Sequence, residues 1–198
     1  MKLQINILLV LLTTIWGCAP MMSAPPAPPM PSDAKQEFGA GLMGGAVNTG
    51  GPHLEPLGNA QIWLRRKAGP QMKDETGVIV QTGWPSLVSG GVYTRRSMAA
   101  SNEIRSINYQ FEGGWIWAGA SLPMAFKVGD RAWLTTQPGV RMSFMGLVQL
   151  PVGMSWQLND TLRLDTEVGG RALGLNNEGE LRTSLWMAYG AIALSSSR

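Results

Sequence analysis

Cysteine and histidine, two residue types that often carry enzyme chemistry, occur once each in this chain of 198 residues, as Cys18 and His53. His53 has a carboxylate two residues away, in Glu55, and a histidine beside a carboxylate can act as a general acid/base pair. Proline and glycine neighbours predict that His53 lies in a loop, and no serine motif accompanies it. The pattern therefore favours a loop histidine over a catalytic one, and a lone histidine supplies no metal site.

Glycine-rich and acidic stretches add no further site. The glycine-rich stretch 41–45 has no lysine–serine ending, so it does not match a phosphate-binding loop. We expect Asp74-Glu75 and the acidic residues at 178–180 to be solvated turns rather than calcium ligands. The sequence therefore predicts no catalytic, cofactor-binding or metal-binding residues in the body of the chain.

The N-terminus has the features of a secretory signal peptide. Lys2 is followed by the apolar run Ile5–Leu12, which is too short to span a bilayer as a helix. The run leads to Gly17-Cys18, which resembles the lipobox of bacterial lipoproteins, where a small residue directly precedes the cysteine. The resemblance implies that residues 1–17 are cleaved, that the Cys18 thiol is diacylated, and that the new amine is acylated.

A covalent lipid on Cys18 is then the only bound group that we expect, and membrane lipid is its partner. Ala19, directly after the cysteine, implies by the same resemblance an outer-membrane location in a diderm bacterium. With no second cysteine, a disulfide framework is excluded. The formal charge of +3 falls to +2 when Lys2 is removed, so we expect no nucleic-acid partner. The basic cluster 65–67 is expected at a strand end near lipid headgroups or in a solvated turn.

Residues 18–37 are expected to form a proline-rich tether. Six of the 13 prolines lie between residues 20 and 31. Such a segment supports neither a helix nor a strand ladder and favours an extended polyproline II conformation. Twelve residues of this kind would reach about 37 Å. The tether would thus separate the lipid from a folded body formed by residues 38–198.

The body alternates apolar and polar residues with the period of two that is typical of β-strands. The clearest runs are 106–112 and 161–168. Weaker runs cover Asn59–Lys67, Leu122–Val128 and Val140–Leu158. Glycines within the runs, such as Gly39 and Gly169, suit barrel bends and close interior packing. The pattern predicts an all-β fold, an antiparallel up-and-down meander of about eight strands that closes into a small barrel.

Alternation alone does not show whether the apolar face meets a core or lipid. Three features favour an apolar exterior. Only 15% of the residues are charged. Trp84, Trp133 and Trp156 fall near strand ends, as in interfacial aromatic girdles. The polar face carries charges of both signs, which a small lumen would have to pair. These charges are Glu112, Arg141, Arg163, Asp165, Glu167, Arg171 and Arg182. The body is similar to the small eight-stranded outer-membrane barrels, which implies that it spans the membrane.

Two classes of function follow. The first is a lipid-anchored outer-membrane β-barrel with a structural or membrane-organising, non-catalytic role, its interior filled by its own side chains. The second is a soluble β-barrel lipoprotein, tethered by Cys18, that binds an apolar ligand or an envelope protein partner. A lipid-acyl hydrolase that uses His53 is a third alternative, because small outer-membrane barrels with that activity use a serine, a histidine and a carboxylate.

Overall fold

The computed structural model describes residues 28–31, 33–48, 53–68, 74–84, 88–99, 101–114, 117–142, 146–173 and 186–198. The expected signal peptide, Cys18 and Arg182 lie outside these described residues. The described part of the chain has no helix that is long and apolar enough to cross a membrane. Its strands form a single sheet. They are β1 (Gln36–Asn48), β2 (Leu54–Ala68), β3 (Asp74–Trp84), β4 (Val88–Ser97), β5 (Arg105–Gly114), β6 (Ala118–Ser121), β7 (Met124–Gly129), β8 (Ala132–Thr136), β9 (Gly139–Met142), β10 (Gly146–Gln157), β11 (Leu162–Leu173) and β12 (Trp186–Ser197).

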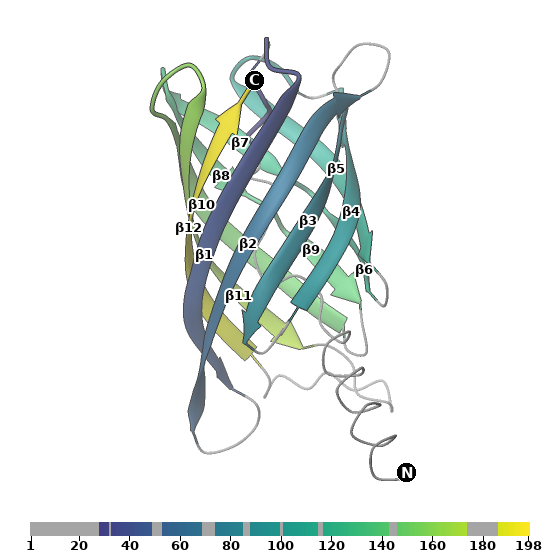
Figure 1. The fold of residues 1–198 in the computed structure, drawn as a ribbon, viewed down its shortest axis with the longest axis vertical. Helices are drawn as coiled ribbons and strands as arrows, with labels where there is room; N and C mark the ends of the chain where they lie inside the picture. Colours follow the sequence, from purple (N-terminus) through teal and green to yellow (C-terminus); the bar gives the residue numbers. More distant parts are fainter. Residues whose placement is uncertain are drawn as a thin grey trace.

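The sheet closes on itself as a barrel, because β1 pairs antiparallel with both β2 and β12 (Figure 1). β6 and β7 both pair with β5, and β8 and β9 both pair with β10, so each of these two couples forms one interrupted wall strand. The described residues thus form a barrel of ten wall strands. This confirms the all-β antiparallel meander and corrects the expected count of about eight strands.

Prolines interrupt the two divided wall strands. Pro123 lies between β6 and β7, and Pro138 lies between β8 and β9. Proline has no N–H to donate to a strand ladder, but its carbonyl still accepts. The carbonyl of Pro123 accepts from the Asn108 N–H at 2.9 Å, and that of Pro138 accepts from the Leu122 N–H at 2.8 Å. The pairing register is the same on both sides of each break, so the side chains keep their faces.

The strand count exceeds the expectation partly because one predicted run spans two strands. Val140–Leu158 was expected as a single stretch of alternation, but β9 ends at Met142 and β10 begins at Gly146. Exposed residues fall at even positions in both strands, as at Val140 and Val148. The alternation therefore has the same parity in both strands and does not reveal where one ends and the next begins.

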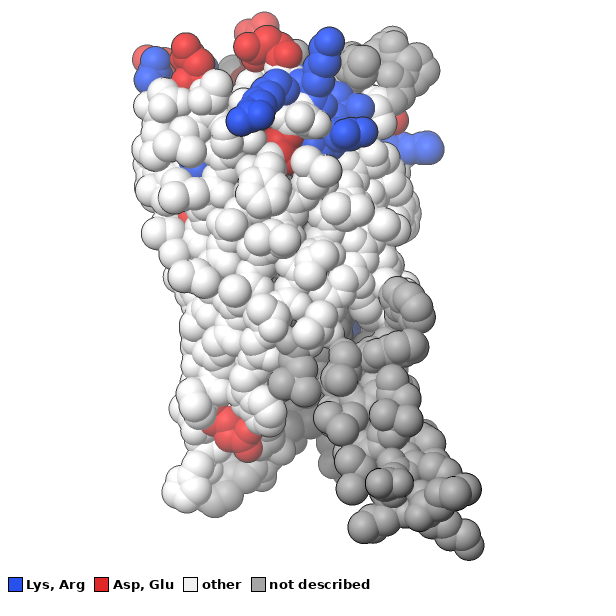
Figure 2. All heavy atoms as spheres, viewed as in Figure 1, with Lys and Arg blue, Asp and Glu red and all other residues white. Residues whose placement is uncertain are grey.

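The described barrel is apolar outside and polar inside. Exposed apolar side chains on the outer wall include Phe38, Leu42, Ile62, Val78, Val80, Val92, Phe111, Val140, Val148, Leu150, Val152, Val168, Ile192 and Leu194. Figure 2 shows a broad uncharged middle, with charged side chains gathered mainly at one end. The expected polar face is buried in the lumen at Glu112, Arg141, Arg163, Asp165 and Arg171, and Glu167 is half-buried.

We call the end of the barrel at which β1 begins and β2 ends the charged rim. The C-terminus also lies there (Figure 1). Exposed basic residues at this end are Lys35, Arg66, Arg96, Arg105, Lys127, Arg131 and Arg198. The charged rim therefore differs sharply from the uncharged wall below it.

Apolar side chains fill two sections of the lumen. Trp63, Ile79, Tyr93 and Ala193 form one buried cluster. The second cluster lies toward the end opposite the charged rim and consists of Met43, Val47, Leu57, Met187 and Tyr189. These two clusters thus occupy part of the interior of the described barrel.

The tryptophans expected at strand ends divide between the two faces. Trp84 is exposed at the end of β3, and Trp156 lies on the outer-wall register of β10. Trp133 is directly paired with Ser155, whose side chain is fully buried in the lumen wall. Directly paired residues share a face, so Trp133 belongs to the lumen face, contrary to the expected girdle position.

Candidate functional site

His53 and Glu55, whose spacing in the sequence could form an acid–base pair, lie apart from the charges of the lumen. His53 is exposed one residue before β2, and Glu55 is exposed on β2, at the end opposite the charged rim. Within the described ranges, no three His, Cys, Asp or Glu side chains lie close enough together to hold a metal ion. The charged groups of the barrel converge instead in the lumen.

Glu37 on β1 is the centre of an ionic network just inside the charged rim. Arg65 donates to both of its carboxylate oxygens, from Nε at 2.8 Å and from Nη2 at 2.9 Å, which is a bidentate pair. Arg163 donates to the same carboxylate at 2.8 Å. Arg65 also donates to Glu75 at 3.1 Å, and Glu75 accepts from Arg95 at 3.3 Å. Charges from β1, β2, β3, β4 and β11 are thus joined across the lumen.

The network extends through an amide to a second ion pair. Arg95 donates to Gln110 Oε1 from Nη2 at 2.8 Å and from Nε at 3.0 Å. Gln110 Nε2 donates to Glu112 Oε2 at 3.2 Å. Glu112 accepts two hydrogen bonds from Arg141, one of them from Nη2 at 3.2 Å. The second pair lies between β5 and β9.

The cluster 65–67 lies at the end of β2, as one of the two expected positions had it, but Arg65 does not face solvent or headgroups. Asp74-Glu75 was expected in a solvated turn, whereas these two residues begin β3. Arg65 is fully buried and Glu75 is 5% exposed. Alternation along β2 and β3 turns every second side chain to the lumen, so that Arg66 faces outward while Arg65 faces inward. The parity of Arg65 with the inward Trp63 is the sequence signal that could have identified it.

Pairing offsets the cost of burying these charges. Removing an ion from water costs several kcal/mol, and an uncompensated buried charge is strongly destabilising. Arg65, Arg95, Arg141 and Arg163 each donate to a carboxylate. The bonds from Arg65 and Arg163 to Glu37, both 2.8 Å long, have the length of charge-assisted hydrogen bonds. Arg163 also donates to Asp165 at 3.4 Å. These bonds join side chains from strands that are distant in sequence, so the network helps to fix which strands lie next to one another in the barrel.

The network also binds main-chain groups of the proline-rich segment Pro28–Pro31, which we call the mouth segment. Arg65 Nη1 donates to the Pro28 carbonyl at 3.1 Å, and Arg163 Nη1 donates to the Pro29 carbonyl at 3.3 Å. The N–H of Met30 donates to Glu75 Oε1 at 3.2 Å. Lys67 Nζ donates to the Pro31 carbonyl at 2.6 Å. The described end of the expected tether therefore contacts the lumen wall.

A turn connects the mouth segment to the barrel. The Ala34 N–H donates to the Pro31 carbonyl at 3.2 Å, and the Ala34 side chain is buried. The Lys35 N–H then donates to the Arg198 carbonyl at 2.8 Å, beside the C-terminus. β1 begins at Gln36, two residues before the expected start of the body. No motif in the sequence marks this segment as a partner of the lumen.

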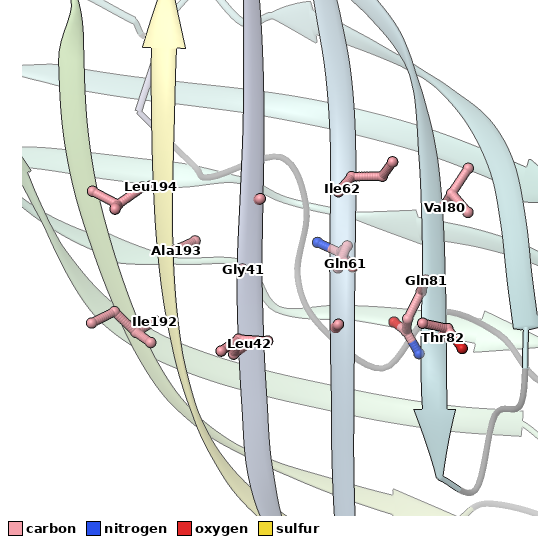
Figure 3. A pocket seen from close by; sticks show the side chains of 12 residues that line it. Gly41, Leu42, Gln61, Ile62, Val80, Gln81, Thr82, Ile192, Ala193 and Leu194 are labelled. Carbon is pink, nitrogen blue, oxygen red and sulfur yellow. The ribbon is translucent and has the colours of Figure 1, made fainter.

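The outer wall carries an apolar hollow on β12, β1, β2 and β3 (Figure 3). Its volume is about 470 Å³. Small residues on the outer face, Ala40 and Ala60, lie between the larger Leu42, Ile62 and Ile192. The hollow can receive an apolar chain, but it offers few polar groups that would select one ligand.

No known family model matches this chain. No curated protein matches it either. Among solved structures, the barrel is similar to the attachment invasion locus protein Ail of Yersinia pestis, with a TM-score of 0.42, 11% identity, and coverage of 83% of this chain and 99% of that chain. The same protein in complex with the heparin analogue sucrose octasulfate gives a TM-score of 0.41, with the same identity and coverage. At this identity neither structure assigns a family.

Proposed function

We propose that the chain is a lipid-anchored outer-membrane β-barrel protein with a structural or membrane-organising, non-catalytic role. The observation that carries this proposal is the inversion of the wall, with exposed apolar side chains outside and paired charges inside. Leu42 and Val148 are 62% and 53% exposed, whereas Arg65 and Arg141 are almost fully buried. A lipid-facing barrel needs this arrangement, and in water it would expose a large apolar area.

The distribution of charge along the barrel supports the same proposal. Exposed basic side chains gather at the charged rim, while the wall below is uncharged (Figure 2). An apolar band bounded by polar and charged ends matches the layers of a bilayer. Exposed Tyr109 and Phe126 lie on the outer wall near the charged rim, where aromatic rings favour the membrane interface.

The anchor in this proposal is the lipid on Cys18, inferred from the lipobox-like sequence. More than one acyl chain gives stable rather than marginal membrane attachment. Two features support a non-catalytic role: Glu37, Glu75 and Glu112 in the lumen each pair with an arginine, and His53 is exposed near Glu55 at the end opposite the charged rim. Because apolar and charged side chains lie in the lumen, stable large conductance of the reconstituted protein would contradict this role.

Fractionation of a chain without Cys18 tests the proposal. Residues 19–198 are expressed behind an ordinary cleavable signal peptide, beside the natural chain. We expect the unlipidated chain to remain in carbonate-washed outer membranes and to migrate differently on SDS gels before and after heating. Soluble periplasmic protein with β-type circular dichroism would contradict membrane spanning. It would instead support the tethered soluble barrel that binds an apolar ligand or an envelope protein.

A further inference from the structure

Each proline carbonyl of the mouth segment, and its one N–H, has a hydrogen-bond partner on the lumen wall. Three of its four residues are prolines, Pro28, Pro29 and Pro31, which have no N–H and offer only carbonyls. The wall presents a cationic donor to each of these carbonyls, from Arg65, Arg163 and Lys67 in turn. The single N–H in the segment belongs to Met30.

That single N–H meets the acceptor that the wall provides. Met30 N donates to Glu75 Oε1 at 3.2 Å, while the other oxygen of Glu75 accepts from Arg65 at 3.1 Å. A buried main-chain donor without a partner would cost free energy comparable to a lost hydrogen bond. Prolines at positions 28, 29 and 31 add no further N–H that the wall would have to accept. The proline pattern therefore suits this wall.

Side-chain burial gives the segment a fixed position. Met30 is 5% exposed and Pro28 is buried, while Asp33 beyond the segment is exposed. Met30 is the largest side chain of the segment, and its flexible thioether adapts to an irregular cavity. The segment is thus held both by main-chain bonds and by a buried anchor.

We propose that the mouth of the barrel is a peptide-recognition site, formed by Arg65, Arg163, Lys67 and Glu75, whose ligand class is an extended proline-rich chain with one free N–H. Its occupant in the folded protein is the chain's own mouth segment, which closes the lumen at the charged rim. Because proline rings fix φ, a proline-rich segment loses little conformational entropy on binding, and its covalent link to β1 gives it a high effective concentration. This inference does not depend on membrane spanning.

Cysteine accessibility in the full mature chain tests the closure. Met30→Cys and Asp33→Cys are made separately in a Cys18→Ser background, and folded protein in detergent is exposed to a bulky, water-soluble maleimide. We expect Met30→Cys to react at least about tenfold more slowly than Asp33→Cys when the segment is held. In denaturant both should react at similar rates. Equal rates in the folded barrel would overturn the proposal.

A second substitution tests the recognition bond without disturbing the buried carboxylates. Lys67→Met keeps the side-chain length but removes the donor to the Pro31 carbonyl. Loss of one hydrogen bond from a charged donor should accelerate labelling of Met30→Cys by about tenfold or more. Lys127→Met is the matched control, because Lys127 is an exposed lysine of the same rim. An equal effect of both substitutions would contradict recognition by Lys67.

Binding in trans tests the ligand class. A chain that lacks residues 19–34 is titrated with a synthetic peptide of residues 24–35, and with the same peptide carrying Met30→Pro. We expect binding of the natural peptide and at least about tenfold weaker binding of the variant, which has lost both the main-chain N–H that donates to Glu75 and the buried Met30 side chain. Equal binding of both peptides, or binding of neither, would overturn recognition of the main chain. If the shortened barrel does not fold, the maleimide labelling rates of Met30→Cys in the full mature chain test the proposal instead.

Discussion

The indole ring of Trp63 occupies the space that a side chain at Gly39 would need. A Cβ atom at Gly39 would lie 2.1 Å from Trp63 Cζ2, and the two residues are directly paired on β1 and β2. The arrangement recurs where Tyr189 lies against Gly169, again at directly paired positions. Aromatic rings of the lumen are therefore accommodated by glycines on the neighbouring strand, which confirms the interior-packing role predicted for Gly39 and Gly169.

Gly39→Ala should destabilise the barrel, because the new methyl group would force the Trp63 ring to move. Overpacking of this kind typically costs about 1–3 kcal/mol. Gly44→Ala is the matched control on the same strand, since a Cβ there would meet no atom within 4 Å, and we expect a change within about 0.5 kcal/mol. Urea unfolding of the barrel refolded into lipid vesicles measures both values. Equal stability of the two variants would show that the packing of the Trp63 ring does not require a glycine at position 39.

Alternation in the sequence was sufficient to predict most strands and which side chains share a face, because it is a local property of each strand. Arg163 and Asp165 could be assigned to the polar face on that basis, and to the lumen once the low charge content and the mixed signs of the charges were considered. The ion-pair partners could not, since Glu37 and Arg163 are 126 residues apart and meet only when β1, β12 and β11 pair. The docking of Pro28–Pro31 likewise depends on that closure.

A charged side chain placed on the outer wall should destabilise the barrel, and the loss of stability should increase with its depth in the bilayer. Leu42 lies in the middle of β1, and Phe38 lies two residues after its start at the charged rim. For a lipid-facing wall we expect Leu42→Arg to cost about 2–4 kcal/mol and Phe38→Arg about 0–1 kcal/mol. Unfolding in lipid vesicles gives both values. Similar small costs for the two variants would indicate that the outer wall faces water.

Loss of one partner of the Glu112–Arg141 pair should be strongly destabilising. Glu112→Gln leaves the Arg141 guanidinium buried without its counter-charge, a change that costs about 3–5 kcal/mol in comparable pairs. The double variant Glu112→Gln/Arg141→Gln should recover part of the loss, because no unpaired charge remains. Glu55→Gln, at an exposed carboxylate, is the control and should have little effect. A tolerated Glu112→Gln would mean that water reaches Arg141 freely.

Removal of the sole histidine should leave lipid composition unchanged. His53 is exposed at the end of the barrel opposite the charged rim, outside the ionic network. We expect His53→Ala to preserve both the stability of the barrel and the lipid profile of cells that express it. Mass spectrometry of extracted lipids provides the comparison with the natural chain. Accumulation of a substrate lipid, or loss of a lysolipid, in the variant would revive the acyl-hydrolase alternative.

The inversion of the wall is tested most directly by spin labels on its outer face. Single cysteines at Leu42, Val80, Val148 and Leu150, in a Cys18→Ser background, carry nitroxides in lipid vesicles, and power saturation compares collisions with oxygen and with a water-soluble nickel complex. Oxygen concentrates in the apolar interior of a bilayer, whereas the nickel complex stays in water. We predict that oxygen contact dominates at all four positions. Dominant contact with the nickel complex at these positions would contradict a membrane-spanning barrel.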